Sequence, residues 1–146
     1  MGHAGIYGSI HEKIRSTLAD IRVELGDVDK PLIVVAHSLG GLIMSNYVCD
    51  AEHGSTSEDG CRPLSEWSAF ERAETLVDLV TMGCNIPLFT LAYDEIESIT
   101  FPPATLEPGL LDVARWLNVY DRDDVLGYPI KQLSKSYGRA VTTAGP

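Results

Sequence analysis

Near the start of the chain, apolar residues recur at spacings of three or four positions. These residues are Ile10, Ile14, Leu18, Ile21 and Leu25. Because such spacing places side chains on one face of a helix, it predicts an amphipathic helix over residues 9–25. Ser9, with Glu12 three positions later, has the pattern of a capping box, and Gly26 is a typical helix end.

Continuous apolar runs predict strands further along the chain. Residues 32–36 follow Pro31, and residues 75–82 form a second run that ends at Gly83; both are short and rich in β-branched residues. Runs without polar alternation are typical of parallel strands that are covered on both faces. Residues 116–120 predict a third strand, so the sequence predicts an α/β fold with a parallel sheet.

Helices and loops are expected between these strands. Residues 39–48 are apolar on nearly every side, which predicts a buried helix behind the first strand. Shorter helices are expected at residues 65–72 and 130–137, and a polar loop at residues 50–63. Several prolines interrupt the stretch that follows, so a short strand or an irregular excursion is expected over residues 86–92.

Composition narrows the class of protein. The chain has 146 residues, 45% of them hydrophobic and 22% charged, which suits a single soluble domain over residues 1–146. Its formal net charge of -10 would repel phosphate backbones, so no nucleic-acid partner is expected. A small neutral or apolar molecule is the simpler expectation for a substrate.

The cysteines and the N-terminal residues bear on the cellular setting. Cys49, Cys61 and Cys84 form no C-x-x-C pair and cannot all be bridged, so neither a disulfide framework nor a metal site is expected. The first residues lack the pattern of a signal peptide, and no apolar run approaches the roughly 18 residues of a membrane helix. We expect a cytoplasmic protein with no membrane span.

One motif carries candidate chemistry, and it joins the first predicted strand to the buried helix. Its sequence is Ala36-His37-Ser38-Leu39-Gly40-Gly41. A serine hydroxyl is a weak nucleophile at neutral pH, so an enzyme must expose it beside a base and supply donors for the oxyanion. A sharp strand-to-helix turn exposes Ser38 and aims the helix N-terminus at the developing charge, while Gly40 lets neighbouring backbone approach closely.

This strand, turn and helix resemble the nucleophile elbow of the α/β-hydrolase family, whose pattern is G-x-S-x-G. The resemblance implies that Ser38 is the nucleophile, that His37 and Gly40 are elbow residues, and that the backbone amide of Leu39 is an oxyanion donor. Ala36 replaces the first glycine of the pattern, as it does in lipase-like members. The implied fold is a three-layer α/β-hydrolase-like parallel sheet with flanking helices.

The resemblance also implies an acid, because the family order is serine, acid, histidine, with the acid after a later strand. Residues 116–120 and the Asp-rich turn behind them match that place. Asp124 is the favoured acid and Asp123 the alternative, although such a turn is often only a solvated loop. Residues 83–85 resemble the family's loop beside the nucleophile, where Cys84 is expected to be a small buried residue.

The general base is missing from the place that the family gives it. The four histidines are His3, His11, His37 and His53, and all of them precede Asp124. His37 is expected to point toward neighbouring loops, and His53 lies on the predicted polar loop. Only one helix precedes the elbow strand. We therefore expect a partial hydrolase domain, incomplete at both ends and inactive alone, with exposed strand edges that favour aggregation.

The function implied by the resemblance is that of a serine hydrolase acting on a small-molecule carboxylic ester, lipase-like and without a cofactor. It would work through an acyl-enzyme intermediate. Two alternatives stay open: a non-catalytic interaction protein on the hydrolase scaffold, and an acyltransferase that uses the same elbow. Substrate choice is expected to lie in the loops at residues 50–70 and 86–110.

Overall fold

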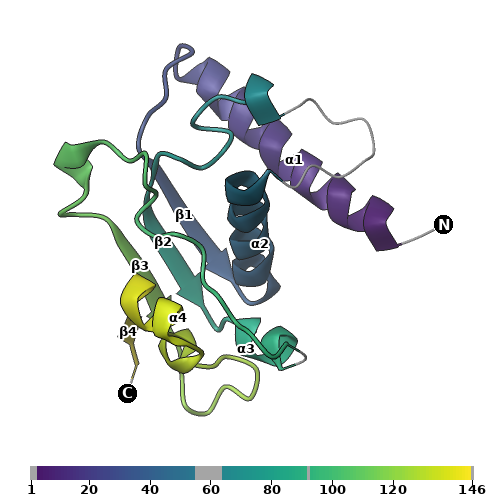
Figure 1. The fold of residues 1–146 in the computed structure, drawn as a ribbon, viewed down its shortest axis with the longest axis vertical. Helices are drawn as coiled ribbons and strands as arrows, with labels where there is room; N and C mark the ends of the chain where they lie inside the picture. The colour runs from purple at the N-terminus through teal and green to yellow at the C-terminus, as the bar shows by residue number, and fades with distance from the viewer. Residues whose placement is uncertain (1–2, 55–63, 92, 146) are drawn as a thin grey trace.

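The fold is centred on a four-stranded sheet (Figure 1). The structure, a computed structural model, describes residues 3–54, 64–91 and 93–145, with only the backbone of residues 3 and 4. All neighbouring strands are parallel, and their spatial order follows the chain. The strands are β1 (Leu32–His37), β2 (Leu76–Met82), β3 (Arg115–Val119) and β4 (Val141–Ala144). The predicted α/β class and parallel sheet are confirmed.

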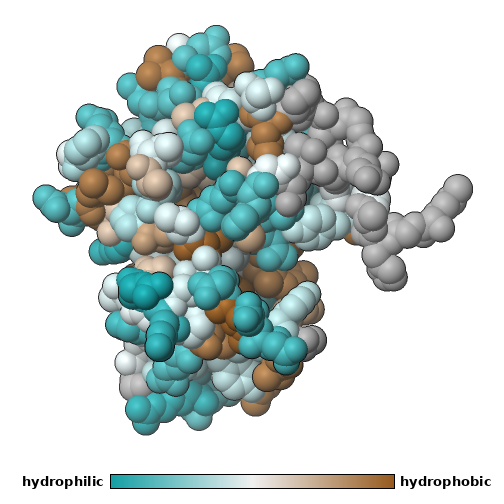
Figure 2. Space-filling view, in the orientation of Figure 1, coloured by the Kyte–Doolittle hydropathy of each residue, from teal (hydrophilic) through white to brown (hydrophobic). Residues whose placement is uncertain are grey.

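The long helices lie against one face of this sheet (Figure 1). The helices are α1 (His3–Glu24), α2 (Leu39–His53), the short α3 (Ile86–Thr90) and α4 (Lys135–Ala140). Beneath them, Leu79, Trp116 and Val141 of three neighbouring strands are buried. Figure 2 presents this side of the molecule, where apolar side chains reach the surface in patches between polar ones.

The opposite face of β1 is open in the described part of the chain. Ile33 and Val35 are 63% and 64% exposed, so the prediction that this strand is covered on both faces is wrong for these residues. An apolar run indicates that both faces of a strand can be buried, but the run itself does not predict which helix or loop would bury them. The third layer of the expected architecture is not formed by the described residues.

Helix α1 begins earlier than predicted. Ser9 lies inside the helix, where its hydroxyl donates to the carbonyl oxygens of Gly5 at 2.6 Å and Ile6 at 3.1 Å. The predicted capping box is therefore wrong, because a hydroxyl within a helix bonds back to the preceding turn. The helix ends at Glu24, and Gly26 follows it with a left-handed φ of 84°, as expected for a residue that terminates a helix.

Several predicted elements are confirmed with shifted bounds. Strands β2 and β3 match two of the predicted runs, and α2 matches the predicted buried helix but continues to His53. Gly54, with a φ of 71°, then ends α2. Of the predicted loop at residues 50–63, residues 55–63 lie outside the described residues. No helix in the described part of the chain is long and apolar enough to cross a membrane.

Other elements differ from the prediction. The expected helix at residues 65–72 is a 3-10 turn, η1 (Leu64–Glu66), followed by hydrogen-bonded turns. Residues 86–90 form α3 rather than a strand, since Pro87 is tolerated in the first turn of a helix. The helix expected at residues 130–137 is divided between a 3-10 turn and α4, and β4, which follows it, was not predicted.

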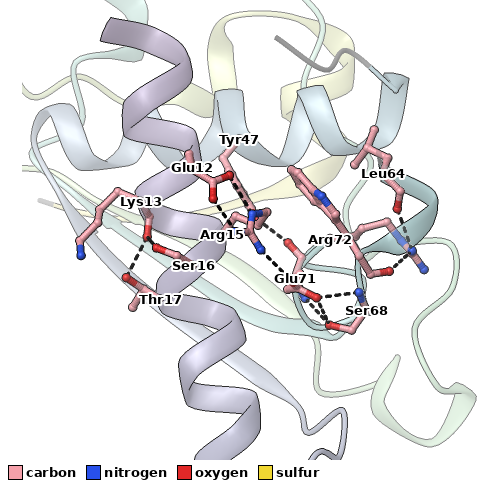
Figure 3. A network of polar contacts seen from close by, with 11 residues as sticks. Glu12, Lys13, Arg15, Ser16, Thr17, Tyr47, Leu64, Ser68, Glu71 and Arg72 are labelled. Carbon is pink, nitrogen blue, oxygen red and sulfur yellow. Dashed lines mark hydrogen bonds and ion pairs between the residues drawn. The ribbon is translucent and has the colours of Figure 1, made fainter. Parts of the chain in front are cut away.

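A buried ion pair fixes α1 to the rest of the fold (Figure 3). The Arg15 guanidinium lies 2.9 Å from the Glu71 carboxylate, and the two side chains are only 11% and 6% exposed. Glu71 also accepts hydrogen bonds from the backbone and hydroxyl of Ser68, while the Ser68 hydroxyl accepts one from the Glu71 amide. This reciprocal pair is a capping box, and Tyr47 of α2 donates to the Glu71 carbonyl.

We predict that replacing Glu71 by alanine lowers the free energy of unfolding by about 2 kcal/mol, because Arg15 then loses its buried partner and keeps only Glu12, and the Ser68 amide loses its acceptor. Urea unfolding followed by circular dichroism measures the change. Glu66→Ala is the matched control, since Glu66 is exposed and its loss should change stability by no more than about 0.5 kcal/mol. Equal losses in both variants would contradict the role assigned to this pair.

Candidate functional site

The predicted site residues gather where the strands end. Ser38 directly follows β1, Gly83 directly follows β2, and Asp124 lies in the turn after β3. The ladder continues past the strands, since the Ser38 amide donates to Met82 at 2.9 Å and the Gly83 amide donates to Val119 at 3.1 Å. Because parallel strands end at a common edge, this edge is where open α/β sheets bind ligands.

Ser38 has an unusual backbone conformation. Its φ is 52° and its ψ is -124°, a region that costs a residue with a side chain roughly 1–3 kcal/mol. It stands at the N-cap of α2, yet its side chain makes no capping hydrogen bond. A serine at this position normally accepts one from the first turn of the helix. The Ser38 hydroxyl is therefore not committed to holding the helix end.

Helix α2 presents its first backbone amides at the same corner. Leu39 is the first residue of this 15-residue helix, and within the described residues its amide makes no backbone hydrogen bond. The side chain of Leu39 is 46% exposed, so the corner is open to solvent. Amides at a helix N-terminus lack partners within the helix and attract negative charge. The Leu39 amide can therefore donate to an anionic oxygen beside Ser38.

The close approach between α2 and the sheet occurs at Gly41, not at Gly40 as predicted. A Cβ at Gly41 would lie 2.7 Å from the Cys84 sulfur and 3.3 Å from Cγ2 of Thr81. A Cβ at Gly40 would meet only the Ala36 methyl group, at 3.8 Å, which is ordinary contact. The sequence places two glycines side by side, and only the packing of α2 decides which of them is constrained.

The two candidate acids differ in their surroundings. Asp124 is half-buried, and its Oδ1 accepts a hydrogen bond from the Leu126 amide at 2.9 Å. Its Oδ2 lies 3.0 Å from the place of a Cβ on Gly83 and 2.4 Å from that of a Cβ on Gly127. Asp123 is exposed. Asp124 is thus the carboxylate that lies against the loop after β2, in a space that two glycines leave open.

Among the described histidine side chains, only that of His37 lies at this edge. Its Nε2 is 3.6 Å from the place of a Cβ on Gly83, so the ring faces the loop after β2, as predicted. His53 lies at the far end of α2, about 22 Å along the helix from Ser38, with Nδ1 2.8 Å from the Cys49 carbonyl oxygen. His53 is therefore excluded as a base for Ser38, and the loop predicted there is helix.

His11 belongs to a cluster that the sequence analysis missed. Its Nδ1 lies 3.2 Å from Asp50 on α2, and the Tyr7 hydroxyl donates to the same carboxylate at 2.8 Å. Burial lowers the pKa of His11 while Asp50 opposes that shift. The spacing of Tyr7 and His11 on one helix face was the available signal. This cluster joins α1 to the C-terminal half of α2, away from Ser38.

The loop after β2 contains two buried groups. Cys84 is fully buried, and burial raises the pKa of its thiol, so it is the small buried residue that was predicted rather than a second nucleophile. Asn85 has a buried Oδ1 with no hydrogen-bond partner in the described part of the chain. Nothing in the sequence pattern distinguishes Asn85 from an ordinary loop residue.

Comparison of the chain with protein-family models, with curated proteins and with solved structures finds no match in any of the three. Any assignment of function therefore depends on the residues and geometry of the sheet edge.

We predict that Gly41→Ala lowers the free energy of unfolding by about 1–3 kcal/mol, because the buried Cys84 sulfur cannot move away from the added methyl group. Thermal or urea unfolding measures the loss. Gly40→Ala is the matched control and should not destabilise, since its methyl group has space and alanine favours helix. Cys84→Ala in the Gly41→Ala background should recover part of the loss. A larger loss for Gly40→Ala would contradict the packing described.

Proposed function

We propose that this chain carries the nucleophile half of a serine hydrolase of the α/β-hydrolase kind, acting on carboxylic esters. The observation that supports the proposal is the strained Ser38 at the end of a parallel strand, with a hydroxyl that does not cap the helix that follows. Proteins retain backbone strain of this kind mainly at functional sites. An ordinary strand-to-helix turn would gain stability from a capping serine.

The proposed reaction uses the Ser38 hydroxyl and the Leu39 amide at the start of α2. The Ser38 oxygen bonds to the ester carbonyl carbon while its proton passes to an imidazole, and the Leu39 amide donates to the oxyanion that forms. Collapse of this intermediate breaks the bond to the alcohol oxygen, which takes the proton from the imidazolium. Water then repeats both steps on the acyl-serine, so the acid leaves and Ser38 is restored.

Asp124 is the acid in this proposal. Strands β1 and β3 are two strand spacings apart, about 10 Å, with β2 between them. Asp124 reaches back over Gly83, toward β1 and Ser38, and in this proposal the imidazole lies between its carboxylate and the Ser38 hydroxyl. Of the described histidine side chains, that of His37 lies at Gly83, with Nε2 3.6 Å from the same place of a Cβ, and no hydrogen bond between described residues joins it to Ser38. We therefore assign the base to none of the described histidines.

The placement of the histidines also favours a second candidate, a non-catalytic interaction protein built on the same scaffold. His11 is engaged with Asp50, and His53 is at the opposite end of α2 from Ser38. A scaffold that has lost its base would keep the strand, turn and helix but not the reaction. The two candidates therefore differ in whether Ser38 reacts once an imidazole is supplied.

We predict that a fluorophosphonate probe labels Ser38 slowly in this chain and at least about tenfold faster when free imidazole is added, since imidazole can act as the general base. Mass spectrometry of labelled peptides identifies the site. Ser38→Ala should abolish labelling, and Ser65→Ala, a change at an exposed serine, should leave it intact.

Each result of this experiment separates the candidates. Labelling that persists in Ser38→Ala would rule out Ser38 as the nucleophile. A folded chain that stays unlabelled at every imidazole concentration would favour the interaction protein over the hydrolase.

We predict that Asp124→Ala reduces the imidazole-dependent labelling rate by about tenfold or more, because the carboxylate orients the ring and stabilises its protonated form. Asp123→Ala is the matched control at the neighbouring, exposed position and should leave the rate unchanged. Measuring the rate at several imidazole concentrations separates weaker imidazole binding from slower reaction. Equal effects of the two changes would remove Asp124 from the proposed site.

A further inference from the structure

A groove of about 420 Å³ lies beside α2, between this helix, α3 and the segment that follows α3. Its volume is in the range of small-molecule sites, about 300–1,000 Å³. None of its lining residues is Ser38, Leu39 or Asp124, so it is distinct from the corner described above.

The floor of the groove is buried and neutral. Ser45 of α2 and Tyr137 of α4 are 6% and 3% exposed, and their hydroxyl groups lie near each other. Burial raises the pKa of Tyr137 to about 12, which keeps its hydroxyl protonated at neutral pH. Ile86 and Ile99 complete the floor and are 1% and 3% exposed. This floor offers apolar contact and hydroxyl groups, but no charge.

The two ends of the groove can be placed along α2. At one end, Leu42 lies one helical turn after Ser38, and α3 begins close to the contact between Cys84 and Gly41. At the other end, the Thr100 amide donates to the Glu52 carboxylate at 3.0 Å, so the segment ending there runs beside the C-terminal half of α2. From Leu42 to Cys49 the groove follows the helix for about 10 Å.

The mouth of the groove is aromatic and acidic. Glu95 and Glu97 line it and are exposed, and within the described residues neither carboxylate has an ion-pair or hydrogen-bond partner. The Tyr93 ring lines the same mouth and is 68% exposed. No lining residue is basic. An aromatic ring together with carboxylates is the combination that attracts an ammonium group.

We propose that this groove binds a small amphiphile, with its apolar body along α2 between Leu42 and Cys49 and a cationic ammonium group at Tyr93, Glu95 and Glu97. An anionic head group would meet two carboxylates and a chain of net charge -10. A ligand without charge would fill the groove but leave the acidic mouth unused.

This site deepens the proposed function and rests on it in one respect. If Ser38 is the nucleophile, the end of the groove at Leu42 lies one helical turn along α2 from it. The favoured substrates are then esters of small amphiphiles that carry an ammonium group.

The first test compares three ligands of equal chain length by isothermal titration calorimetry on the Ser38→Ala chain. Hexyltrimethylammonium should bind at least about fivefold more tightly than hexanol, and hexanoate should bind most weakly. Raising the salt concentration should reduce the preference for the cation, because the mouth is exposed to solvent. Equal affinities for the cation and the anion, or no binding of the cation, would overturn the proposal.

Two sets of variants locate the site. Glu95→Gln with Glu97→Gln should weaken binding of the cation about fivefold and leave hexanol unchanged, whereas Asp112→Asn, an exposed carboxylate elsewhere, should change neither. Asn46→Phe should fill the groove and weaken both ligands at least about tenfold, and Gln132→Phe on an exposed turn is its control. Binding that survives Asn46→Phe in a folded chain would place the ligand elsewhere and overturn the proposal.

A final comparison links the groove to Ser38. With imidazole present, a fluorophosphonate with a trimethylammonium tail should label the unmodified chain at least about fivefold faster than one with a carboxylate tail. Binding of hexyltrimethylammonium without any labelling would refute the hydrolase but keep the groove. Labelling at equal rates with both tails would refute the link while Ser38 remains the nucleophile.

Discussion

The contact between α2 and the ends of β1 and β2 is the constraint on which the rest of this edge depends. Gly41 has no space for a side chain, because the Cys84 sulfur and a Thr81 methyl group occupy it. With the helix held that close, the chain has a single residue, Ser38, in which to turn from strand to helix, and its positive φ follows. The same contact brings α3 beside α2 and so forms one end of the groove.

Much of the fold could be predicted because its elements are marked by local patterns. The apolar runs identify β1 and β2, and the helical spacing of isoleucine and leucine identifies α1. Ser9 was misread because a serine with a glutamate three positions later has the pattern of a helix start, although Ile6 and Tyr7 continue the apolar spacing of α1 toward His3. Strand β4 was missed because it has only four residues, Val-Thr-Thr-Ala, and no apolar run, and it is a strand because it pairs with β3.

The candidate site also has one part that local sequence patterns predict and another that only the folded chain brings together. Ser38 could be singled out from sequence because strand, turn and helix are contiguous around it. The difference between Asp124 and Asp123 depends on Gly83 and Gly127, which reach the turn only after folding. The groove combines residues from three helices and the segment after α3, so no local pattern predicts it. Assignment to the α/β-hydrolase family stays a prediction that chemical labelling can test.

The burial of Cys84 makes this cysteine a natural reporter of local opening. Its sulfur is sealed between the first turn of α2 and the sheet, whereas Cys49, on the same helix, is partly exposed. A thiol reagent can reach Cys84 only while α2 is lifted away from the strands. The alkylation rate of Cys84 in the native protein would therefore report how often α2 separates locally from the strands beside Ser38.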